Sequence, residues 1–192
     1  MNAYVPLTTV HVLVLFLHLA GALALFIGYG IEWTASSLFR NAASVEQVRA
    51  WLRVFKVSPP LAGAGLGVLL LSGGYLASLS GAMKQGWMLA TFIGIFLALA
   101  LGFALILPRM KAIRSALPAG NEPLPAALRS RLADPILLTS IRVRVLLAAG
   151  IVYLMAAKPP LVSSLLILVF AVILGLLFSI PVLTKTPAPA NS

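Results

Sequence analysis

The sequence predicts an all-α fold, a polytopic bundle of membrane-spanning helices. Hydrophobic residues make up 61% of the 192 residues, charged residues only 9%, and the mean hydropathy is +1.06. Four runs without a charged residue are longer than the roughly 18–20 residues that cross a bilayer as a helix. A water-exposed surface cannot be covered with so few charges, which excludes an ordinary soluble domain.

Five spans are expected, in chain order, over residues 7–31, 58–80, 86–107, 141–157 and 161–182. The fourth is the shortest, because only thirteen uncharged residues separate Arg144 from Lys158, which is about 20 Å of helix. It crosses the membrane if Arg142 and Arg144 snorkel to one interface and Lys158 to the other. A re-entrant segment is the alternative.

An amphipathic helix is expected before the second span, over residues 44–57. Ser44 and Gln47 have the spacing of a capping box. Apolar and basic side chains then recur on opposite helical faces: Val45, Val48, Trp51, Leu52 and Phe55 against Arg49, Arg53 and Lys56. We expect this helix to lie on the inner leaflet, with Trp51 and Phe55 facing the membrane or the spans.

The remaining segments complete a single membrane domain, residues 1–184. The stretch "SALPAGNEPLPAALRSRLADP" is rich in proline and polar residues, which predicts an irregular loop around its middle. Residues 185–192, rich in proline and small residues, are expected to form a flexible tail.

The basic residues predict the orientation of the chain. Twelve of the fourteen lysines and arginines fall in the first and third loops and the tail, whereas the second and fourth loops hold only Lys84 and Lys158. This asymmetry places the N-terminus outside and the C-terminus in the cytoplasm, which requires an odd number of spans. The net charge of +10 therefore indicates contact with a lipid bilayer and its anionic headgroups, not with nucleic acid.

Several classes of chemistry are excluded or disfavoured by composition. The chain has no cysteine, so disulfides, thiolate nucleophiles and iron–sulfur clusters are excluded. Glu46, Glu122 and Asp134 fall in loops, which leaves no chain of carboxylates inside the membrane. No Ser–His–Asp pattern or phosphate-binding glycine loop is present. We therefore name no catalytic residue, and the pattern favours a non-catalytic protein.

The two histidines of the chain both lie in the first apolar run, "VHVLVLFLHLAGALALFIGYGIEW". His11 and His18 are seven residues apart, close to two helical turns, so they share a face. Glu32 falls near the same face, close to the cytoplasmic interface, where we expect it to pair with an arginine or to meet headgroups. His18 falls near the membrane midplane, where a polar side chain is costly and is usually paired or liganding.

Two interpretations of His18 remain open: a hydrogen bond to a neighbouring helix, or ligation of a metal ion or haem b. His11, nearer the surface, is either solvated and hydrogen-bonded or a second cofactor contact. Two turns separate the imidazoles by roughly 10 Å, whereas two nitrogens on one metal ion lie about 4 Å apart. A second ligand would come from elsewhere: Met88, Met155, Tyr75, Tyr153, water, or the same histidine of a second subunit about a twofold axis.

The second span carries a run of small residues, "LAGAGLGVLLLSGGYLASLSG". Gly63 and Gly67 form a GxxxG pair, and Gly74 with Ser78 continues the pattern. Such a face favours close helix packing. It would also accept the flat edge of a porphyrin, a chlorophyll or a carotenoid.

The stretch "FLHLAGALALFIG" resembles the first span of the copper-resistance-D-like superfamily of bacterial membrane proteins, which includes the HemJ-type protoporphyrinogen oxidases and several uncharacterised families. Leu17, His18 and Gly21 match its Leu-His-hydrophobic-x-Gly/Ala pattern. The later "GVLLLSGGYLA", "GW" and "LPRMKAIR" are similar in layout to one uncharacterised family, so the resemblance covers residues 10–114.

The resemblance implies a bacterial inner-membrane protein and, from the haem-associated members, His18 as an axial haem ligand. Histidines on later spans are missing, which argues against copper transport. No embedded lysine or arginine matches the partner residue that HemJ-type enzymes use, which argues against porphyrinogen oxidation.

Two functions are therefore expected. One is a haem- or metal-associated membrane protein that uses His18, in electron transfer or tetrapyrrole handling. The other is a non-catalytic accessory subunit that packs lipid, pigment or partner helices, either as a homodimer or in a larger membrane complex.

Overall fold

The computed structural model describes residues 9–120 and 123–181, and over them the chain is helical apart from turns and one isolated bridge between Ser44 and Pro123. Its elements are α1 (Thr9–Phe39), α2 (Val45–Ser80), the 3-10 turn η1 (Ala82–Lys84), α3 (Gly86–Ala100), the π-helical segment η2 (Leu101–Ile106), α4 (Leu107–Ser115), α5 (Ala126–Leu132), α6 (Pro135–Ala157) and α7 (Leu161–Leu177). The all-α prediction is confirmed. Glu122, the outer ends of the first and last predicted spans and the tail 185–192 lie outside the described residues.

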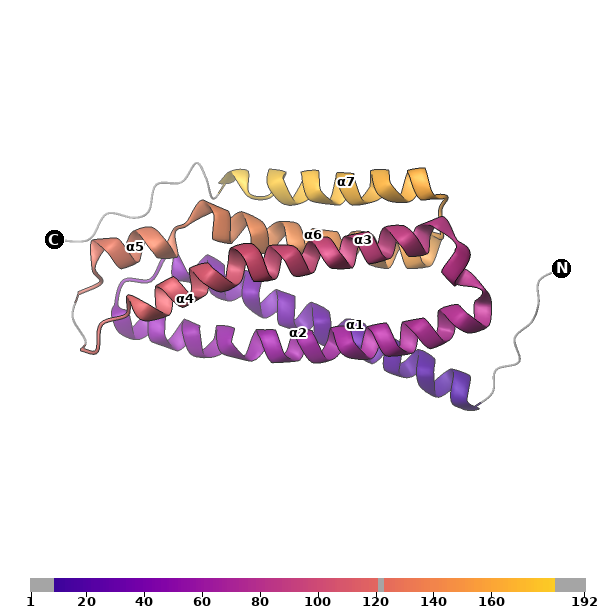
Figure 1. The fold of residues 1–192 in the computed structure, drawn as a ribbon. Coiled ribbons are helices and arrows are strands. Elements are labelled where there is room, and N and C mark those ends of the chain that lie inside the picture. The colour runs from indigo at the N-terminus through magenta and orange to yellow at the C-terminus, as the bar shows by residue number, and fades with distance from the viewer. Residues whose placement is uncertain (1–8, 121–122, 182–192) are drawn as a thin grey trace.

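The long helices run roughly parallel to one axis (Figure 1). Thr9–Phe39, Val45–Ser80, Gly86–Ser115 and Ala126–Ala157 are long and apolar enough to cross a membrane, and the shorter Leu161–Leu177 follows them. These five stretches correspond in order to the five predicted spans. Helix α1 begins at one end of the bundle and α7 ends at the other (Figure 1), as an odd number of passes requires.

Basic residues gather at one end of the bundle, which we call the basic end. The turn between α1 and α2, helix α4 and helix α5 lie there (Figure 1). It carries Arg40, Arg49, Arg53, Lys56, Arg109, Lys111, Arg114, Arg129 and Arg131. The opposite end carries Lys84 and Lys158. The predicted separation of charge is therefore a property of the folded bundle.

Helix α2 begins where the sequence predicted, but it does not stop before the second span. The Ser44 hydroxyl accepts a hydrogen bond from the Gln47 N–H at 3.2 Å, and the Gln47 side chain accepts one from the Ala43 N–H at 2.8 Å. The helix then continues through Pro59 and Pro60 to Ser80. The two prolines remove two backbone N–H donors, but the helix does not end there. The predicted helix over residues 44–57 is therefore present, as the first part of a longer helix that continues into the second span.

The apolar face of this first part of α2 packs on protein. Val45, Val48, Leu52 and Phe55 are buried in the largest core cluster, together with residues of α1, α4, α5 and α6, and Trp51 packs against it. The helical periodicity is confirmed, and Trp51 and Phe55 face the spans, one of the two surfaces expected for them. The covering surface also includes α5, which follows the irregular middle of the third loop, because Leu124, Leu128 and Leu132 recur every four residues.

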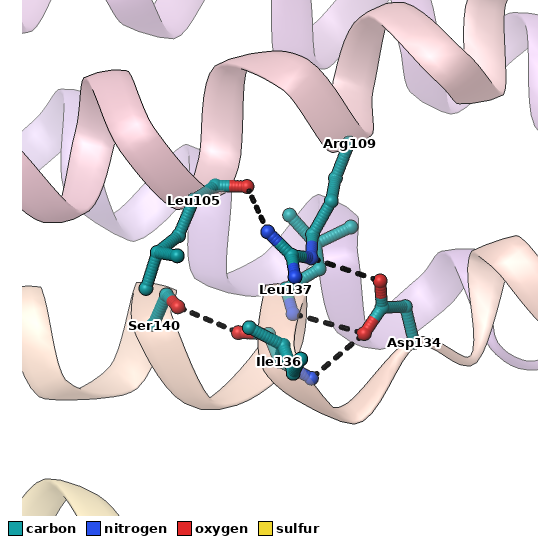
Figure 2. Close-up of polar contacts among 6 residues, drawn as sticks. All are labelled: Leu105, Arg109, Asp134, Ile136, Leu137 and Ser140. Carbon is teal, nitrogen blue, oxygen red and sulfur yellow. Dashed lines mark hydrogen bonds and ion pairs between the residues drawn. The ribbon is translucent and has the colours of Figure 1, made fainter.

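Helix α6 is longer than the predicted fourth span because Asp134 starts it early. One Asp134 oxygen accepts from the Ile136 and Leu137 N–H groups at 2.8 and 3.4 Å. The other accepts from Arg109 Nε at 3.0 Å, and Arg109 Nη1 donates to the Leu105 carbonyl at 3.0 Å (Figure 2). The resulting helix has 23 residues, about 34 Å at 1.5 Å per residue.

The α1–α2 hairpin is closed by small residues. A Cβ at Gly65 would lie 2.7 Å from the Gly21 carbonyl oxygen, and one at Gly28 would lie 2.8 Å from the Ala62 Cβ. Neither Gly63 nor Gly67 has an atom within 4 Å of such a position. Close packing by small residues is therefore present, but it uses Gly65 and not the predicted GxxxG pair.

Candidate functional site

Three helices meet at a buried carboxylate, that of Glu32 on α1. Its side chain is only 4% exposed. The Ser58 hydroxyl, from α2, donates to Glu32 Oε1 at 2.7 Å. Arg144, from α6, donates through Nη2 to Glu32 Oε2. Both carboxylate oxygens are thus occupied, and we call these three residues the ion-pair site.

The Arg144 guanidinium has two further neighbours. It lies over the Tyr29 ring, 4.2 Å from the centroid, which is a cation–π arrangement. On its other side, a Cβ at Gly102 would lie 2.8 Å from Arg144 Nη1. Gly102 belongs to the π-helical segment η2, and only a glycine leaves room for the guanidinium there. Arg144 Nε is buried without a hydrogen-bond partner among the described residues.

The burial of this pair adds to what the sequence predicted. Arg144 was expected to snorkel to an interface and Glu32 to lie near one. Arg144 lies fourteen positions before Lys158 in the sequence, about 21 Å along the helix. Side chains of α1, α2 and α6 surround both charges within the protein. Glu32 pairs with an arginine, as expected.

Arg142, two residues earlier on α6, has a different environment. It is 7% exposed, and its guanidinium lies over the Trp33 ring at 5.4 Å from the centroid. Its Nη1 donates to the Leu138 carbonyl at 3.4 Å. No carboxylate pairs with it within residues 9–120 and 123–181.

His18 lies against α2, twenty or so ångströms along α1 from the ion-pair site. Its Nδ1 is 3.0 Å from the Ser72 hydroxyl oxygen. The Ser72 hydroxyl donates its one hydrogen to the Val68 carbonyl at 2.5 Å. A Cβ at Gly73 would lie 2.9 Å from His18 Cε1, so Gly73 leaves space for the ring. We call His18, Ser72 and Gly73 the histidine site.

The hydrogen bonds assign the proton on the imidazole. Because the Ser72 hydroxyl donates to Val68, it accepts from His18, and the proton is on Nδ1. Neutral His18 therefore has its lone pair on Nε2. The Leu69 backbone, also on α2, is a second hydrogen-bond neighbour of the ring. Of the two interpretations from the sequence, the hydrogen bond to a neighbouring helix is present, while ligation stays a prediction.

The other residues considered as ligands lie elsewhere. Met88 and Met155 pack with Trp87 in a small core cluster, and Tyr153 is 57% exposed. His11 lies two turns before His18 on α1 and is half-buried. Within the described residues, no three side chains of His, Asp or Glu gather as a metal site would require.

Comparison with known proteins places the chain in a family. The family described as "Predicted integral membrane protein (DUF2269)" matches residues 12–159, which include the ion-pair site and the histidine site. No curated protein and no solved structure matches the chain. With more than half of its length matched and a helical bundle of membrane-spanning length, the chain belongs to the DUF2269 family of integral membrane proteins.

Proposed function

We propose that this chain is a haem-associated protein of the bacterial inner membrane, with His18 Nε2 as an axial ligand of haem b. The observation that carries the proposal is the orientation of the imidazole. A ligating histidine usually donates its other ring N–H to a fixed acceptor, which sets the tautomer and the ring plane. Ser72 is such an acceptor for Nδ1.

The surroundings of His18 fit a flat group better than a compact metal ion. Gly73 lies against the ring, so the backbone of α2 carries no side chain there. Such a surface without side chains suits the edge of a macrocycle. The same Nε2 would also bind a free metal ion, but a compact site needs more ligands than the described residues bring together.

The ion-pair site would support this role from a distance. It connects α1 to α2 and α6 by two side-chain contacts to Glu32. The register of α1 against α2, and with it the contact between His18 and Ser72, depends on this attachment. When bound, haem b would supply one-electron transfer, and the chain would serve electron transfer or tetrapyrrole handling. The finer resemblance to the copper-resistance-D-like superfamily belongs to the same proposal.

The orientation is proposed from charge. The basic end faces the cytoplasm, because loops rich in lysine and arginine stay inside. The N-terminus is then outside and the C-terminus inside. A second axial ligand would come from a second copy of the chain, in a homodimer about a twofold axis. Either His18 or His11 of that second copy would supply it.

The test is an absorption spectrum of the full chain, purified in mild detergent from haem-supplied cells. We expect a Soret band that is lost in His18→Ala and weakened or shifted in His11→Ala. Ser72→Ala, which removes only the acceptor of Nδ1, should retain the haem with a shifted band. A Soret band of equal height in His18→Ala, or none in the unaltered protein, would overturn the proposal.

The second candidate is a non-catalytic accessory subunit of a larger membrane complex. One observation favours it: a Cβ at Gly63 or Gly67 on α2 would meet no atom of the described chain within 4 Å, although GxxxG faces usually meet another helix. Because the chain lacks cysteine, Gly67→Cys gives one clean crosslinking position. Crosslinking to a neighbouring helix in membranes, with no Soret band, would favour this function.

A further inference from the structure

Arg142 and Arg144 are two residues apart on α6, yet their positive charges are handled differently. Arg144 pairs with Glu32. Arg142 is 7% exposed, lies over the Trp33 ring and donates to one backbone carbonyl, that of Leu138. A buried charge without a counter-charge is costly in a membrane protein. Arg142 therefore requires a negatively charged partner, and the described part of the chain does not supply one.

A second arginine adds to this excess of charge. Arg40, directly after α1, is half-buried and close enough to Arg142 for the two like charges to interact. No ion pair is formed by Arg40 within residues 9–120 and 123–181. Two cations near one another, one of them buried, are stable only if something negative lies between or beside them.

The direction of the Arg142 side chain indicates where that anion lies. Its Nη1 donates to Leu138, four residues earlier on α6, so the guanidinium points toward the basic end. Sixteen residues of α6 separate Arg142 from Lys158, about 24 Å of helix. In a hydrocarbon core about 30 Å thick, this places the guanidinium within reach of one headgroup layer. Trp33, beside it, is typical of that layer.

We propose that Arg142 and Arg40, beside Trp33, bind a phosphate-bearing anion, with an anionic phospholipid headgroup as its source. A guanidinium presents paired N–H donors that match phosphate oxygens. Basic pockets between membrane helices at the cytoplasmic side bind lipid headgroups in this way. Free phosphate has the same chemistry, so the experiment separates the two sources.

The experiment measures lipid binding to the full chain in detergent by native mass spectrometry. Phosphatidylglycerol and phosphatidylcholine are titrated separately, and inorganic phosphate is tested by the midpoint of thermal unfolding. The variants are Arg142→Gln, Arg142→Lys and Arg40→Gln. Arg53→Gln is the matched control, because it removes the same charge from an exposed position of the basic end.

We expect phosphatidylglycerol to bind more tightly than phosphatidylcholine, and Arg142→Gln to weaken it about five- to tenfold. Arg40→Gln should weaken it less, Arg142→Lys should restore part of the affinity, and Arg53→Gln should change nothing. Stabilisation by phosphate alone, lost in Arg142→Gln, would support the site with free anion as its ligand.

Equal binding of both lipids without an effect of phosphate would overturn the proposal. So would unchanged phosphatidylglycerol affinity in Arg142→Gln. Should Arg142→Gln fail to fold, Arg40→Gln tests the proposal instead, because Arg40 is half-buried and lies outside α6. Unchanged phosphatidylglycerol affinity in Arg40→Gln would then overturn the site.

Discussion

The ion-pair site and the histidine site share helix α1, where Glu32 and His18 are fourteen residues apart. They differ in how many of their polar atoms have a hydrogen-bond partner. Both Glu32 oxygens accept hydrogen bonds, from α2 and α6. His18 is held by α2 alone, through the Ser72 hydroxyl and the Leu69 backbone. The first arrangement fixes three helices and leaves no oxygen for a ligand. The second orients a ring and leaves a lone pair available.

This difference separates a structural role from a binding role. A saturated buried pair resists the loss of either partner, because the remaining charge has no water to solvate it. Removing an imidazole that makes only part of its hydrogen bonds would cost the protein little stability. It would, however, abolish the binding of any ligand that the imidazole holds.

The largest effect is expected from breaking the ion pair. Glu32→Gln or Arg144→Met each strands a buried partner and should lower the free energy of unfolding by about 3–5 kcal/mol. The double variant should recover a large part of that loss. Thermal or denaturant unfolding in detergent measures all four proteins as a double-mutant cycle. Additive losses in the double variant would contradict a coupled pair.

The next largest loss of stability is expected where α1 packs closely on α2, the two helices that contribute to both sites. Gly65→Ala forces a methyl group to within 2.7 Å of the α1 backbone and should cost about 1–3 kcal/mol. Gly67→Ala, one half-turn away with no atom within 4 Å, is the matched control and should be neutral or slightly stabilising. Unfolding midpoints of the two variants decide it. Equal losses would mean that the helices are not packed as described.

A smaller effect is expected at the second, half-buried ion pair, Asp134 with Arg109 (Figure 2). Asp134→Ala removes the N-cap of α6 as well as the ion pair, and should cost about 1–2 kcal/mol. Asp134→Asn, which still accepts from the α6 backbone, should recover most of it. The ratio of the two losses, from unfolding midpoints, separates the cap from the charge.

The fold was predictable because its signals are local. Uncharged runs gave the spans, and Ser44 with Gln47 gave the start of α2. What failed depended on contacts between distant segments. The continuation of α2 through Pro59 and Pro60 is one such feature. The apolar face of residues 45–55 was visible, but not that α5 and α6 cover it.

The site was predictable in part for the same reason. His18 stands out because it is polar at mid-membrane, and its position on α1 needs no knowledge of other helices. Arg144 was assigned to a loop because charges usually end a span. A single signal hinted otherwise: Glu32 is the one acidic residue of the first span, and a buried acid needs a cation. Which of fourteen basic residues supplies it depends on the tertiary fold.

The smallest effect is expected from Ser72→Ala, and it sharpens the comparison most. It leaves His18 in place but removes the acceptor of Nδ1, which should cost about 1 kcal/mol or less, because hydrogen bonds between membrane helices are worth little on average. Ser72→Thr, which keeps the hydroxyl, is the control. Ring ¹⁵N shifts of His18 by NMR report the tautomer directly, and we expect Nδ1–H in the unaltered protein and a mixture in Ser72→Ala. A tautomer that does not change would show that Ser72 does not orient the imidazole, and the lone pair on Nε2 would then lose its structural cause.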